Sequence, residues 1–193
     1  MWEDLVREHG GAAIASLDGA AEAVRGETRF AAVLVHDAGV LPAVAALGPA
    51  QAAAFAALGG AGGAGDIEEA NALLEALRAG ERDAYLLKAG RVGGTDPERS
   101  IEVTAEHVKA ILAAIATGTI EWEDDPDFGY RAAAGAPGIE GRDRFLLIPR
   151  FLYARTERVY EYAALVPRLR RERAERLAAL DGLDRAIIEA VRA

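Results

Sequence analysis

Two short, mainly apolar segments restrict the fold of this chain more than any other feature. Phe30 to Val35 is an uninterrupted apolar run of strand length, which is typical of a strand covered on both faces. Ala84 to Ala89 forms a second segment of this kind, and an amphipathic helix is expected between them from about Asp66, with Gly80 after its end. A strand, a helix and a strand in this order predict a parallel pair. We therefore expect an α/β fold with a small mixed or parallel sheet flanked by helices.

Local patterns predict the remaining elements. Gly48-Pro49 is typical of a helix start, and Thr104 and Gly118 are typical of the two ends of a helix that carries a regular apolar face. We expect a helix over Trp2–His9 and a strand over Ala12–Leu17, followed by helices over Pro49–Leu58 and from Thr104 to Gly118. A surface excursion is expected over Glu121–Gly141. A long C-terminal helical segment with a kink or restart at Pro167 and a last helix over Asp184–Arg192 complete the chain.

Length and composition limit the function classes. A chain of 193 residues is large enough for one core and short for two, so residues 1–193 are expected to form a single domain. The sequence has no cysteine, which excludes disulfides, thiolate nucleophiles and zinc–thiolate sites. A net charge of −9 opposes binding to nucleic acid or to anionic lipid. With neither a membrane-length apolar run nor a signal-peptide pattern, we expect a cytoplasmic protein without membrane contact.

Four local clusters each allow a functional and a structural interpretation. The glycine-rich loop Gly59–Gly65 precedes a helix, as phosphate loops do, but acidic residues follow it where lysine and a hydroxyl are needed, so a flexible connector is favoured. The acidic segment Glu121–Asp127 could hold Mg²⁺ or Mn²⁺, although a solvated acidic turn is favoured. His36-Asp37 could form an acid–base pair at a strand end, although a structural histidine is favoured. The arginines from Arg168 to Arg176 alternate with glutamates, as on an exposed helix.

Several segments, read in order, resemble the C-terminal part of ATP-dependent phosphoenolpyruvate carboxykinase. The run from Phe30 through His-Asp-Ala-Gly-Val-Leu-Pro-Ala-Val is similar to a family strand that leads into Asp-x-x-x-Pro-Pro-Val. Leu47-Gly-Pro-Ala-Gln-Ala is similar to the family's Leu-Thr-Pro-Glu-Gln-Ala, and Ala84-Tyr-Leu-Leu-Lys-Ala-Gly-Arg-Val-Gly-Gly is similar to a strand that ends in Asn-Thr-Gly-x-x-Gly-Gly. Further segments follow in the same order as in the family: Arg99-Ser-Ile-Glu-Val-Thr with the Ala110-Ile-Leu helix, Asp125-Pro-Asp-Phe-Gly, Pro137-Gly-Ile and Pro149-Arg. The resemblance covers about 160 residues; residues 1–29 form an unmatched extension and residues 150–193 a helical tail.

The resemblance implies a gluconeogenic lyase that converts oxaloacetate and ATP to phosphoenolpyruvate, CO₂ and ADP, with ATP and Mg²⁺ or Mn²⁺ as cofactors. In that family a phosphate loop with a lysine and two metals neutralise the transferred phosphoryl group. This sequence contains neither that loop, nor the Asp-Asp strand that follows it, nor the Thr-Glu-Arg-Gly segment that faces the substrate. We therefore expect the chain alone to be inactive and to hold these cofactors weakly.

The part of the family's site that can be carried over is the nucleotide contact. The resemblance implies that Arg99, Ser100 and Ile101 match positions that contact adenine and ribose, whereas Lys88, Ala89 and Val108 depart from the family's pattern. Expected partners are a second chain that carries the missing phosphate-loop half, or another copy joined through an open sheet edge. The alternative is a non-catalytic interaction module that uses its long C-terminal helix for docking.

Overall fold

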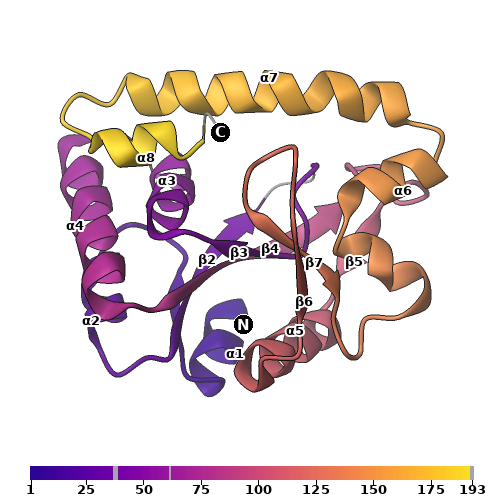
Figure 1. The fold of residues 1–193 in the computed structure, drawn as a ribbon, viewed down its shortest axis with the longest axis horizontal. Coiled ribbons are helices and arrows are strands. Elements are labelled where there is room, and N and C mark those ends of the chain that lie inside the picture. The colour runs from indigo at the N-terminus through magenta and orange to yellow at the C-terminus, as the bar shows by residue number, and fades with distance from the viewer. Residues whose placement is uncertain (37–38, 61, 192–193) are drawn as a thin grey trace.

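The protein is an α/β fold with helices on both faces of a mixed sheet (Figure 1). The computed structural model describes residues 1–36, 39–60 and 62–191. No helix among these residues is both long and apolar enough to cross a membrane. The strands are β1 (Gly11–Ile14), β2 (Phe30–His36), β3 (Val44–Leu47), β4 (Asp83–Val92), β5 (Ile101–Val103), β6 (Glu121–Asp124) and β7 (Arg131–Gly135). The helices are α1 (Trp2–Glu8), α2 (Ala20–Arg25), α3 (Pro49–Gly59), α4 (Ala64–Gly80), α5 (Ala105–Thr117), the 3₁₀ helix η1 (Gly141–Leu146), α6 (Pro149–Arg155), α7 (Val159–Ala178) and α8 (Arg185–Glu189).

The sheet contains seven strands, six of which lie in the order β1-β2-β4-β3-β7-β6. The seventh, β5, pairs with the C-terminal end of β4. Strands β1, β2 and β4 run parallel, so the expected parallel pair is confirmed, with Phe30 opposite Asp83 and His36 opposite Ala89. Strands β3, β7 and β6 extend the sheet by antiparallel pairing. The expected mixed sheet is therefore confirmed, and it is larger than the sequence indicated.

Each central strand divides its side chains between two cores. On β2, Ala31 and Val33 join the core beneath α2, α3, α4, α7 and α8, whereas Phe30, Ala32 and Leu34 join the core beneath α1, α5 and α6. Strand β4 alternates in the same way. This two-sided burial is the physical reason for the uninterrupted apolar run.

The segment Glu121–Gly141 differs from the expected surface excursion. It contains the β6–β7 hairpin, which adds two strands to the sheet. Trp122 stacks on Tyr85 of β4 at 5.7 Å between ring centroids, and Ala132 and Ala133 are buried. An acidic strand beside an alanine-rich one lacks the period-two apolar pattern that would predict such a hairpin.

The edges of the sheet are β1 and β6, so the apolar strand β2 lies inside it. Strand β6 carries Glu121, Glu123 and Asp124. Charged side chains on an edge strand oppose pairing with another sheet. The structure therefore offers no open edge at Phe30–Val35 through which two copies could pair.

Candidate functional site

The carboxyl ends of β1 and β2 open into a cavity of about 390 Å³. This is the position at which open α/β sheets bind ligands. The sheet contributes Leu34, Val35 and His36 from the end of β2, and α7 contributes Arg173 and Arg176 to the lining. Further lining residues are Ala15, Leu41, Phe55, Leu58 and Gly59. The cavity therefore joins an apolar wall to two guanidinium groups and an exposed imidazole. Asp37, considered from the sequence as an acid–base partner of His36 although a structural histidine was favoured, lies outside the described residues.

The two arginines of the cavity are held in place by contacts with α3 and the β6–β7 turn. The guanidinium carbon of Arg173 lies 5.3 Å from the ring centroid of Phe55 and 5.2 Å from that of Phe128. Arg176 donates a hydrogen bond of 2.9 Å to the carbonyl of Leu58. Stacking on aromatic faces and bonding to a carbonyl hold a guanidinium in a fixed position. The cavity therefore has two fixed guanidinium groups in its lining.

The sequence did not predict that Arg173 and Arg176 line a cavity. It predicted an exposed helix over the arginines from Arg168 to Arg176. The prediction is confirmed for Arg168 and Arg171, which pair with Glu172 and Glu175. The rotation of α7 about its axis decides which arginines face inward. Tyr162, Val166 and Leu169 pack against the core and set this rotation.

Lys88 holds the chain that follows β2. Its side chain is 1% exposed, and its ammonium donates to the carbonyls of Leu41 at 3.2 Å and Gly39 at 3.4 Å. The backbone N–H of Lys88 also donates to the carbonyl of Ala43. A charged residue inside an apolar strand was the signal that could have predicted this function, because burial of an ammonium requires acceptors. Lys88 thus fixes the loop beside the cavity.

The loop between β4 and β5 carries the three residues that the family resemblance assigned to nucleotide contact. Arg99 has an exposed side chain 3.6 Å from the Asp96 carboxylate. The Ser100 hydroxyl is buried, donates to the carbonyl of Asp96 and accepts from Arg91 at 2.7 Å. Ile101 is buried in β5. Of these three residues, only Arg99 therefore has an exposed side chain that a ligand could contact.

Gly93 lets this loop pack closely against α6. It has φ +95°, and a Cβ there would lie 2.6 Å from a methyl carbon of Leu152. Its carbonyl accepts a hydrogen bond of 2.6 Å from Arg158, which also pairs with Glu161. The β4–β5 loop and the α6–α7 corner therefore form one connected surface.

The glycine-rich connector does not expose a phosphate cradle. The Asp66 carboxylate accepts from the N–H groups of Gly62 at 2.8 Å and Gly63 at 3.4 Å. These are the amides that would face an anion at the start of α4. A phosphate at this position would have to displace the carboxylate.

The acidic segment before β7 does not form a metal centre in the part of the chain that the structure describes, where no group of three or more metal-binding side chains occurs. Glu123 pairs with Arg150 at 3.1 Å. Asp125 accepts from the N–H groups of Asp127 and Phe128, and Asp127 accepts from the Tyr162 hydroxyl at 2.6 Å. These carboxylates therefore close a turn against α7.

No family model matches the chain, and no curated protein matches it either. The resemblance to the carboxykinase family therefore rests on the residues quoted in the sequence analysis alone.

Proposed function

We propose that the chain is an anion-binding α/β domain, related to the C-terminal lobe of ATP-dependent phosphoenolpyruvate carboxykinase, that binds a nucleotide without catalysing phosphoryl transfer alone. One observation carries the binding proposal: the cavity at the carboxyl ends of the parallel strands has Arg173 and Arg176 on one wall. Two fixed guanidinium groups favour a phosphate-bearing ligand in a chain whose net charge is −9.

The arrangement of the family-like segments supports the proposed relation. The strands at Phe30–His36 and Asp83–Val92 are neighbours in the sheet. The Arg99 loop follows the second of these strands directly, and the helix capped by Thr104 comes next. The segments that resemble the nucleotide side of the carboxykinase are thus consecutive in the chain and joined by strand pairing.

Calorimetric titration with Mg-ATP and Mg-ADP tests nucleotide binding. We expect Arg99→Ala, and independently Arg173→Ala, to weaken binding by about 10- to 150-fold, because each removes a charge-assisted hydrogen bond worth about 1.5 to 3 kcal/mol. Arg78→Ala on α4 is the control, because Arg78 is also exposed and lies on another element. Absence of binding at millimolar nucleotide would contradict the proposal.

A separate assay tests the expected lack of catalysis by the chain alone. We expect the pure chain to form no phosphoenolpyruvate from oxaloacetate and Mg-ATP, because no phosphate loop with a lysine is present in the sequence. Formation of phosphoenolpyruvate by pure protein would overturn this part of the proposal.

One observation favours the alternative, a non-catalytic interaction module. Tyr160 is 92% exposed and Val159 is 55% exposed at the start of α7. Large apolar side chains at such exposure are typical of contact surfaces when they gather in one place. If nucleotide binding fails in the titration, this module becomes the better interpretation.

A further inference from the structure

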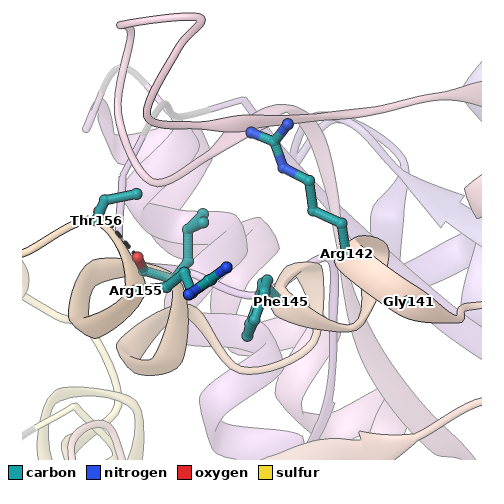
Figure 2. A pocket seen from close by; sticks show the side chains of 6 residues that line it. Gly141, Arg142, Phe145, Arg155 and Thr156 are labelled. Atoms are coloured by element: carbon teal, nitrogen blue, oxygen red, sulfur yellow. Dashed lines mark hydrogen bonds between the residues drawn. The ribbon is translucent and has the colours of Figure 1, made fainter.

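A cavity of about 720 Å³ lies between η1 and α6, near the α6–α7 corner. Gly141, Arg142 and Phe145 line it from η1, and Leu152, Arg155 and Thr156 line it from α6 and the residue that follows. Figure 2 shows Arg142 and Arg155 extending from opposite sides of the space between the two helices. A volume of this size is ordinary for a small-molecule site.

The guanidinium groups at this cavity lack anionic partners. Neither Arg142 nor Arg155 makes an ion pair or hydrogen bond through its side chain with any residue that the structure describes. Arg144, which lines the adjoining cavity together with Phe145, is equally unpaired within the described chain. Elsewhere in the molecule, arginines such as Arg91 and Arg150 have glutamate partners. Arg142, Arg144 and Arg155 therefore form a local group of positive charge without an ion pair to any described residue, in a chain with 31 acidic and 22 basic residues.

Local structure accounts for this group of positive charge only in part. Asp143, the acidic residue between two of these arginines, points toward α5 and lies 3.2 Å from the Nε2 atom of His107. Arg155 is in the last turn of α6, where the helix dipole favours a cation. Arg142 is in the first turn of η1, which also contains Asp143 and follows Glu140.

The rest of the cavity is apolar or weakly polar. Leu152 is buried, and the half-buried ring of Phe145 lies between the two arginine-lined cavities. The Thr156 hydroxyl donates to the carbonyl of Leu152 at 2.9 Å, so its lone pairs remain to accept a hydrogen bond. A fitting ligand therefore has a strongly anionic group and an apolar or aromatic body.

We infer that the cavity between η1 and α6 is a second binding site, separate from the cavity at the carboxyl ends, for a small organic phosphate. Its phosphate group would lie between Arg142 and Arg155, and its apolar body would contact Phe145. A phosphate dianion suits this arrangement better than a carboxylate, because its three terminal oxygens can accept from two planar guanidinium groups together.

Titration of the full chain with phenyl phosphate, in the absence of a divalent metal, tests this inference. We expect binding that the double variant Arg142→Ala/Arg155→Ala weakens at least tenfold. Arg25→Ala/Arg78→Ala removes the same charge from two exposed arginines on other helices and is expected to leave affinity unchanged. Benzoate is expected to bind more weakly than phenyl phosphate.

Two further variants distinguish binding at this cavity from binding elsewhere on the molecule. Phe145→Leu is expected to weaken phenyl phosphate more than pyrophosphate, since only the former has a ring to contact residue 145. Arg173→Ala is expected to leave phenyl phosphate binding intact, which distinguishes this site from the one in the proposed function. Absence of binding at millimolar phenyl phosphate, or equal loss in the two double variants, would overturn the inference.

Discussion

At the scale of single residues, a buried charged side chain holds a loop at the carboxyl ends of the parallel strands. Lys88 is almost completely buried, and its ammonium donates to the backbone carbonyls of Gly39 and Leu41 in the loop after β2. A buried ammonium is tolerated only where its partners offset its lost hydration. Lys88 therefore anchors the neighbouring loop to β4.

Asp125 gives the fold a testable pH dependence. Burial raises the pKa of its carboxyl group, although hydrogen bonds from Phe128 and Asp127 act in the opposite direction. A carboxyl whose pKa is higher in the folded state binds more protons there, so stability decreases as pH rises from the unfolded pKa through the folded one. We expect Asp125→Asn to gain stability relative to the natural protein between about pH 4 and pH 7, because the amide oxygen can accept the same hydrogen bonds without a charge.

Urea denaturation across this pH range measures the effect. Asp124→Asn is the control, because Asp124 lies beside Asp125 and its side chain is 98% exposed. A stability difference between Asp125→Asn and the natural protein that stays constant with pH would contradict the assigned cause.

At the scale of elements, the segments with clear local signals were predicted correctly. Strand β2 and helices α3 and α5 have the expected character because their apolar runs, caps and helix-start proline are local signals. The Thr104 side chain accepts from the N–H of His107 as its position predicts. Strands β3 and β5 were not predicted, because they have only four and three residues, respectively, and so short a segment shows no clear alternation of apolar and polar residues. Both are defined by pairing with β4, which no local signal contains.

The candidate sites were predictable to a smaller degree. Arg99 could be identified through resemblance, whereas Arg142 and Arg155 stand 13 positions apart in a stretch without a recognisable motif. Only the packing of η1 beside α6 brings these two arginines to one cavity. Sites assembled from separate elements in this way require the fold to be known.

Pro167 lies inside helix α7 and allows a prediction about the stability of this helix. The sequence suggested a kink or restart there. The helix does not restart, because it runs from Val159 to Ala178 with the proline inside it. Proline in a helix interior costs about 3 kcal/mol through a lost hydrogen bond and a clash with the preceding turn, while restricting the unfolded chain recovers about 0.4 to 1 kcal/mol. We expect Pro167→Ala to stabilise the protein by about 1 to 3 kcal/mol in urea denaturation.

The matched control is Pro49→Ala. Pro49 is exposed and occupies the first turn of α3, where proline has no hydrogen bond to lose. This variant is expected to be neutral or slightly destabilised. Equal effects of the two substitutions would show that Pro167 is not a source of strain in α7.

At the scale of the whole molecule, the C-terminal helices are part of the core. The sequence suggested a helical tail over residues 150–193, yet Val166, Leu177 and Ile187 are buried in the same cluster as β2 and β4. Figure 1 shows α7 extending along the molecule above α3 and the sheet, with α8 folded back beside it. The hydrogen bonds of Asn71 with Gly182 and Asp184 attach the turn between these helices to α4.

If α7 belongs to one cooperative unit with the sheet, both should unfold together. We expect amide hydrogens in the middle of α7 to exchange with the same free energy of opening as those of β2, measured by native-state hydrogen exchange. Leu177→Ala removes a fully buried side chain and is expected to lower both values equally, by about 2 to 5 kcal/mol. Tyr160→Ala removes a side chain that is 92% exposed and is expected to change neither. Exchange in α7 far faster than in β2, with Leu177→Ala affecting α7 alone, would mean that the helix detaches independently and that the cavity carrying Arg173 and Arg176 opens with it.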